Sequence, residues 1–148
     1  MKKLKKVTAA LAAATMVTSC AGVVTSADEV VNAVNVSYST VAETFTAADG
    51  TVVPAGATAV TLSIENNTGF SASDITLNAT ADLLGVDGIV AATNGSAYGD
   101  AIVSAAQNGS KVVVTSASLD NSKNDGTLVT LYTTSDAKVT VEDASFES

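Results

Sequence analysis

The sequence predicts an all-β fold, an antiparallel two-sheet sandwich of jelly-roll-like type, and three observations lead to this prediction. Apolar and polar residues alternate with a period of two through most of the chain after residue 30. Gly, Asn and Asp residues separate the alternating runs at the spacing of sandwich turns. Helical periodicity is absent beyond the N-terminal segment, apart from a short turn expected at residues 82–85. We expect about eight strands.

The alternation is clearest in residues 60–65, 74–78 and 138–142. In the first of these segments Val, Leu and Ile take every second position, and Thr, Ser and Glu take the positions between them. Successive side chains of a strand point to opposite faces, so each such strand has one buried and one solvated face. We therefore expect two antiparallel sheets whose apolar faces pack together.

Turn residues lie between the strands. Asn108-Gly109 predicts a tight hairpin between residues 101–106 and 111–117, because both turn positions must tolerate a positive φ. Residues 66–69 are expected to form another turn, and residues 120–126 a polar loop before the strand that begins at Thr127.

Residues 1–27 are interpreted as a secretory signal peptide. Four lysines within the first six positions precede an apolar run of 11 residues, which is too short to span a bilayer as a helix. Cleavage after Ala27 gives a soluble, secreted chain. Cleavage before Cys20, within a loose lipobox, gives a surface lipoprotein lipidated at that cysteine. In both cases residues 28–148 form one domain, and the single cysteine allows no intrachain disulfide.

The charge of residues 28–148 excludes some partners. Three lysines stand against fifteen acidic residues in this part of the chain, which gives a net charge of −12 at pH 7. Phosphate backbones and anionic lipids repel such a surface. We expect no nucleic-acid partner, and contact with a membrane only through the signal or a lipid anchor.

The residue types favour binding over catalysis. The chain has no His, which excludes catalytic triads and imidazole metal sites. It also has no Trp, and the loop that begins at Asp120 has Asp125 where a calcium-binding EF-hand loop needs Gly, and Leu131 where it needs Glu. We predict no enzyme activity, no catalytic or metal-binding residue and no cofactor. Core or edge packing is expected for the three tyrosines, Tyr38, Tyr98 and Tyr132.

From Ala55 onward the chain resembles a cohesin domain, the module that binds dockerins in cellulosomes. The resemblance begins with residues 56–70, in which a Gly-x-Thr segment opens an alternating strand that ends in a polar, Gly-containing turn. It continues through residues 74–78 and 111–117 to the Gly-x-Leu-x-x-Leu arrangement of residues 126–131. A closing strand with a trailing Phe follows at residues 138–146. The match is divergent, and the chain stops at Ser148 without the last strand of many cohesins.

The resemblance implies a protein-binding module whose partner is a dockerin carried by a polysaccharide-degrading enzyme. It implies docking on a sheet formed by residues 74–80, 101–106, 111–117 and 138–143. The candidate partner-binding residues point outward from these strands: Asp74, Thr76, Asn78, Lys111, Val113, Thr115, Lys138, Thr140 and Glu142. A solvated sheet face is the alternative interpretation of this pattern. The alternative function is that of a carbohydrate-binding or structural surface sandwich, with polysaccharide as the ligand in the first case.

Overall fold

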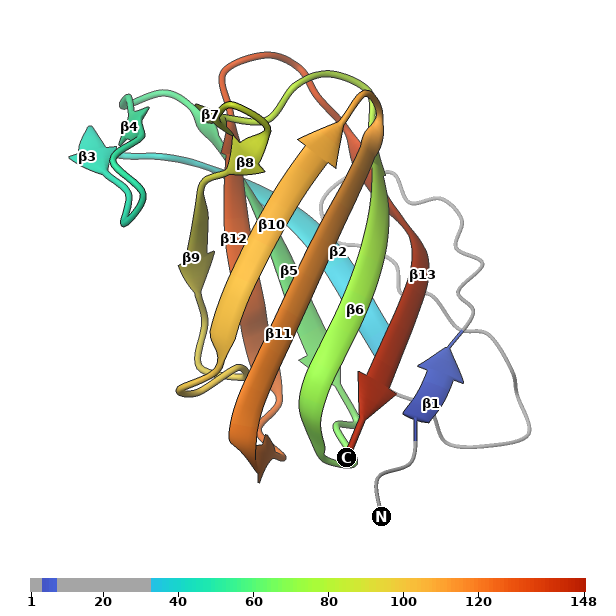
Figure 1. Ribbon diagram of the computed structural model, residues 1–148. Coiled ribbons are helices and arrows are strands. Elements are labelled where there is room, and N and C mark those ends of the chain that lie inside the picture. Colours follow the sequence, from blue (N-terminus) through green and yellow to red (C-terminus); the bar gives the residue numbers. More distant parts are fainter. Residues whose placement is uncertain (1–3, 8–32) are drawn as a thin grey trace.

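The computed structural model describes residues 4–7 and 33–148, and this part of the chain contains thirteen β-strands and no helix (Figure 1). The strands pair antiparallel throughout, in two sheets that pack face to face and a separate small hairpin. The predicted all-β sandwich is confirmed. It follows from the period-two alternation, which gives most strands one apolar face to bury.

The larger sheet has seven strands, and its middle is built from long, regular pairings. Its spatial order is β1 (Leu4–Val7), β13 (Val139–Glu147), β6 (Phe70–Ala79), β11 (Lys111–Ser122), β10 (Ile102–Asn108), β8 (Ile89–Val90) and β7 (Gly85–Val86). The four strands that the sequence predicted to share a sheet are neighbours here. They run side by side across the front of the molecule (Figure 1).

The second sheet lies behind the first in Figure 1. It has four strands in the order β2 (Ala33–Thr40), β5 (Thr58–Glu65), β12 (Gly126–Thr133) and β9 (Ala92–Asn94). β2 and β5 pair without interruption over eight residues, from Ala33 opposite Glu65 to Thr40 opposite Thr58. The shift of register in β12 between Thr127 and Val129 is a local irregularity in an otherwise regular ladder.

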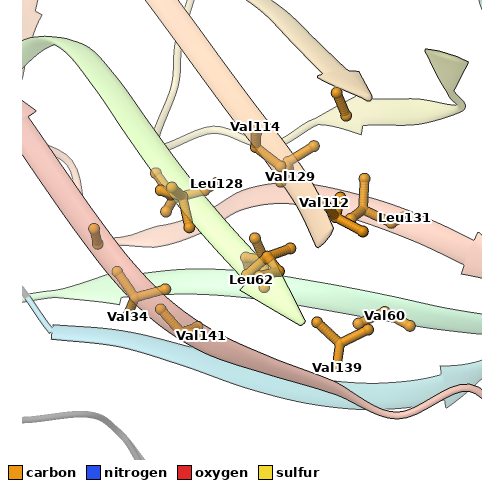
Figure 2. Close-up of a cluster of buried hydrophobic side chains, with 14 of the residues drawn as sticks. Val34, Val60, Leu62, Val112, Val114, Leu128, Val129, Leu131, Val139 and Val141 are labelled. Carbon is orange, nitrogen blue, oxygen red and sulfur yellow. The ribbon is translucent and has the colours of Figure 1, made fainter. Parts of the chain in front are cut away.

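The main core fills the space between the two sheets. Figure 2 shows Leu62 and Leu131 of the four-stranded sheet in the same buried cluster as Val112 and Val114 of the seven-stranded sheet. All four of these side chains are fully buried. Three aromatic rings belong to the same core, where Phe70 makes edge-to-face contacts with Phe146 and Tyr98 at centroid distances of 5.1 and 5.9 Å.

A second, smaller core lies on the other side of the four-stranded sheet. The hairpin of β3 (Phe45–Thr46) and β4 (Val52–Val53) packs there against residues of β5 and β12. The ring of Phe45 meets that of Tyr132 edge to face at 5.3 Å, and Val53 is fully buried. This hairpin covers part of the outer face of the four-stranded sheet.

Two loops differ from the sequence prediction. Residues 120–122 extend β11, so the loop before β12 is restricted to residues 123–125. A register shift after Ala117 allows this extension, because it brings Ser122 opposite Phe70 and lets the Ser122 hydroxyl donate to the Ala97 carbonyl at 2.5 Å.

The short turn expected at residues 82–85 lies instead at Asp87-Gly88, between β7 and β8. Both residues have positive φ, 53° and 84°, as a tight hairpin turn with matching twist requires. The sequence signal was present, since Asp-Gly is a strong hairpin dipeptide. The predicted Asn108-Gly109 hairpin is confirmed, with Gly109 at a φ of 65°.

Most of the predicted signal peptide, including Cys20 and both cleavage sites, lies outside the described residues. The exception is Leu4–Val7, which forms β1 and pairs antiparallel with the end of β13. Every residue of the two described core clusters lies between Val34 and Phe146. We therefore expect residues 28–148 to fold without the N-terminal segment, since that segment contributes one edge strand to the described structure.

Candidate functional site

The candidate site is the outer face of the seven-stranded sheet, which is the face turned away from the main core. Strand register decides which residues share it, because residues directly opposite each other in an antiparallel pair point to the same side. Lys111 pairs with Asn78, which in turn pairs with Thr140. Thr115 pairs in the same way with Asp74, and all of these side chains are at least partly exposed.

The structure thus brings seven of the nine predicted residues together on one face: Asp74, Thr76, Asn78, Lys111, Val113, Thr115 and Thr140. They come from three neighbouring strands, β6, β11 and β13. The hydroxyls of Thr115 and Ser104 lie 3.3 Å apart, which extends the polar part of the face to β10. This arrangement follows from the alternation that the sequence displays.

Lys138 does not join the face. It precedes β13, and its Nζ atom lies 5.4 Å from the centre of the Tyr38 ring, which belongs to the four-stranded sheet. The Tyr38 hydroxyl in turn accepts a hydrogen bond from the Val139 N–H at 2.9 Å. Lys138 therefore bridges the side of the sandwich, where a cation over an aromatic face is favourable.

Glu142 also departs from the predicted pattern. The register of β13 shifts between Val141 and Asp143, so Glu142 is the extra residue of a β-bulge. Asp143, not Glu142, lies opposite Thr76. A bulge cannot be read from alternation alone, because it depends on how two strands fit to each other.

Sequence reasoning named Val113 but missed the apolar residues that continue from it across the same face. Val86 pairs with Ile89, which pairs with Ala106, which pairs with Val113. We call these four residues the apolar row. Val86 and Ile89 are about half exposed, at 51% and 52%. The row continues directly into the polar residues Thr76 and Asp143. The Asp-Gly turn was the signal that could have placed Val86 and Ile89 at this edge.

A second exposed apolar position lies on the same face, at the first residue of β10. Ile102 is 80% exposed and pairs with Ala117, which pairs with Ala72. Exposed large apolar side chains that gather on one face are typical of a surface that contacts another molecule. The outer face thus combines apolar side chains over β7, β8 and β10 with polar and acidic ones over β6 and β13.

The three tyrosines pack into the fold, as predicted. Tyr98 is buried, and its hydroxyl lies 2.9 Å from that of Ser73. Burial raises the pKa of the Tyr98 phenol, and its hydrogen bonds with serine hydroxyls partly oppose this effect. Tyr132 is also buried and donates to the Thr93 hydroxyl at 2.7 Å. None of these rings belongs to the strands of the outer face.

Two hollows in the described structure are lined by residues that make structural contacts. One, of about 280 Å³, is lined by Asp82, Leu83 and Gln107. The side chain of Gln107 is engaged there, since it accepts from the Leu83 N–H at 2.8 Å and donates to the carbonyls of Ala81 and Gly109. Its role is to hold the β6–β7 connection against the β10–β11 hairpin.

The other hollow, of about 260 Å³, lies beside the end of β11 and the loop that follows it. In that loop the Asp125 carboxylate accepts a hydrogen bond from the Asn67 N–H at 2.9 Å, and the Asn124 carbonyl accepts one from the Asn67 side chain. The loop is thereby fastened to the turn at residues 66–69. The described residues contain no group of three or more His, Cys, Asp or Glu side chains that could hold a metal ion.

Within the described ranges no helix is long and apolar enough to span a membrane. No family model, curated protein or solved structure matches this chain.

Proposed function

We propose that the chain is an exported, cohesin-like binding module that recognises a protein partner through the outer face of its seven-stranded sheet. The partner is a dockerin borne by a polysaccharide-degrading enzyme, and no catalysis or cofactor belongs to this chain. The observation that carries the proposal is the apolar row, which lies half exposed beside polar residues on a sheet face.

The composition of this face supports protein binding. Protein interfaces combine a small apolar centre with a polar rim, and a few well-placed side chains supply most of the affinity. Val86 and Ile89 are suited to the first role, and Asp74, Asn78 and Thr140 to the second. Four long paired strands also present a regular surface, which can accept a patch of the usual size of about 800 Å² per partner.

The same face argues against a sugar-binding platform. Binding of carbohydrate by a flat sheet relies on aromatic side chains that stack on sugar rings. Tyr98 and Tyr132 are buried, and Tyr38 lies on β2 of the opposite sheet under Lys138.

Export is supported by the sequence of residues 1–27 alone. The acidic net charge of the remaining chain favours a partner with basic residues at its contact surface.

The test uses residues 28–148 and two matched variants. Val86→Asp places a charge in the apolar row, whereas Val52→Asp places the same charge at a similarly exposed valine of the β3–β4 hairpin. Binding to a panel of purified dockerin modules is measured by calorimetry, with calcium and with a chelator. Binding to insoluble plant polysaccharide is measured in parallel.

We expect calcium-dependent binding to at least one dockerin, because the calcium belongs to the dockerin. Val86→Asp should weaken it by about tenfold or more, as burial of an unpaired charge in an interface does. Val52→Asp should leave it unchanged. Retention on polysaccharide without dockerin binding would replace the proposal by its carbohydrate-binding alternative. An equal loss of dockerin affinity in the two variants would exclude this face as the binding surface.

A further inference from the structure

The outer edge of β13 offers one short stretch of backbone for pairing with an added strand. On its inner side β13 pairs with β6 from Val139 to Glu147. On its outer side, its last four residues pair antiparallel with β1: Glu147 lies opposite Leu4 and Ala144 opposite Val7 (Figure 1). A peptide segment of this chain is thus seated on the edge in regular register.

The rest of that edge is closed by two features. At Val139 the Tyr38 hydroxyl occupies both backbone groups, because it accepts from the N–H at 2.9 Å and donates to the carbonyl at 3.3 Å. The β-bulge between Val141 and Asp143 then interrupts the regular spacing of backbone groups. Bulges of this kind disfavour pairing at a sheet edge. Residues 144–147 follow the bulge and are regular, which defines a site four residues long.

The charges of the edge and of its occupant are complementary. Glu142 and Asp143 precede the four-residue stretch, and Glu147 ends it. The occupant has the sequence Leu-Lys-Lys-Val, with Lys5 opposite Phe146 and Lys6 opposite Ser145 in the register. By this register Lys6 is placed on the side of the sheet that Ser145 and Glu147 share, whereas Lys5 is placed on the side of the buried Phe146. Opposite charges on neighbouring strands stabilise their pairing, whereas a second acidic copy of β13 would be repelled.

We propose that residues 144–147 form a strand-addition site for an extended, lysine-bearing peptide segment of a partner protein. Leu4–Val7 is this chain's own example of such a segment, and its removal with the signal peptide leaves the edge open. That step rests on the export included in the proposed function. Main-chain hydrogen bonds supply the affinity in this mode of recognition, and the acidic residues supply the preference for lysine.

The site is tested with the synthetic peptide Met-Lys-Lys-Leu-Lys-Lys-Val, which corresponds to residues 1–7. It is titrated into isotope-labelled residues 28–148, and amide chemical shifts are followed by NMR. We expect saturable shifts concentrated in residues 144–147 and their neighbours in β6. The same peptide with Pro at its fifth and sixth positions should not bind, because proline removes the N–H groups of the added strand.

A charge variant with a matched control tests the lysine preference. Glu147→Lys should weaken the binding of the peptide by about fivefold, since an exposed charge attraction is replaced by a repulsion. Glu43→Lys makes the same change at an exposed residue next to the β3–β4 hairpin and should have no effect. In the full chain, Lys5→Pro together with Lys6→Pro should speed hydrogen exchange of the amides in residues 144–147.

The proposal is overturned if the peptide causes no shifts, if shifts fall outside β13 and its neighbour, or if the proline peptide binds equally well. A peptide-free dimer joined through β13 would also overturn it. Val86→Asp distinguishes this site from the proposed dockerin face, because it should leave peptide binding unchanged. If dockerins bind and the peptide does not, only the strand-addition proposal is ruled out. If the peptide binds and dockerins do not, only the dockerin proposal is ruled out.

Discussion

The outer faces of the two sheets both carry apolar side chains, but within the described residues these side chains are covered on the four-stranded sheet and exposed on the seven-stranded sheet. On the four-stranded sheet, Ala59 and Tyr132 lie beneath the β3–β4 hairpin, and Phe45 and Val53 complete a closed cluster. On the seven-stranded sheet, Val86 and Ile89 stay about half exposed, and Ile102 is more exposed still. Among the described residues, the hairpin that could cover an outer face is folded over the smaller sheet.

The difference shows which apolar residues serve the fold and which are left for a partner. Removing apolar surface from water stabilises a fold by roughly 25 cal/mol per Å², so the covered cluster contributes to the stability of the monomer. The exposed row contributes little of this kind, because its side chains remain partly in contact with water. If this distinction holds, substitutions on the two faces will have unequal effects on folding.

The largest effect is expected for Tyr132→Ala, on the covered face. The substitution opens a cavity under the hairpin, removes the ring contact with Phe45 and leaves the Thr93 hydroxyl without the hydrogen bond it accepts at 2.7 Å. We expect the free energy of unfolding to fall by about 3 kcal/mol or more. Urea denaturation followed by circular dichroism measures it. A loss below about 1 kcal/mol would show that the hairpin does not cover this face in solution.

Phe45→Ala removes the hairpin side chain that covers Tyr132 and leaves Tyr132 itself in place. Phe45 is only partly buried and contacts Tyr132 edge to face at 5.3 Å. We expect a loss of about 2 kcal/mol, smaller than that of Tyr132→Ala because less surface returns to water. The double variant should lose less than the sum of the two, since both remove the same contact. Strict additivity would contradict the contact.

A pH effect is expected from Tyr98, which lies inside the sandwich and belongs to neither outer face. Its pKa is raised in the folded state by burial. The stabilisation linked to its neutral form is fully present below the unfolded pKa of about 10 and is lost as the pH rises through the folded pKa. Stability measured by denaturation between pH 9 and 11.5 should therefore fall less steeply in Tyr98→Phe than in the parent chain.

The smallest effect is expected for Ile89→Ser, in the exposed apolar row. Its side chain is 52% exposed, so its truncation should change the free energy of unfolding by no more than about 0.5 kcal/mol. The same denaturation assay applies, with Val52→Ser of the β3–β4 hairpin as the control at similar exposure. A loss above about 1.5 kcal/mol would mean that Ile89 supports the monomer fold, and the distinction between the two faces would fail.

Much of the outer face could be predicted from the sequence. Asp74, Thr76 and Asn78 alternate with Ile75 and Leu77, and a strand with one apolar face can bury only that face. Lys111, Val113 and Thr115 are related to the buried valines of β11 in the same way. Their shared face follows once the Asn108-Gly109 hairpin and the antiparallel pairing fix the register.

The residues that the sequence placed wrongly, Lys138 and Glu142, take positions that depend on contacts between distant strands. Lys138 precedes β13 by one position, and only the approach of Tyr38 from the other sheet decides where it lies. Glu142 is displaced by a bulge that arises where β13 fits against β6. Val86 and Ile89 were missed because β7 and β8 are two residues long, too short for alternation to be visible.

By itself the sequence determined that this chain forms antiparallel strands and which side of each long strand is buried. The physical reason is local, since alternation and turn residues act within a few positions of the chain. Only the tertiary structure decided that the β3–β4 hairpin covers the smaller sheet, that the apolar row stays exposed and that residues 144–147 form an edge with a seated strand. These features depend on which surfaces meet after residues far apart in the sequence have paired.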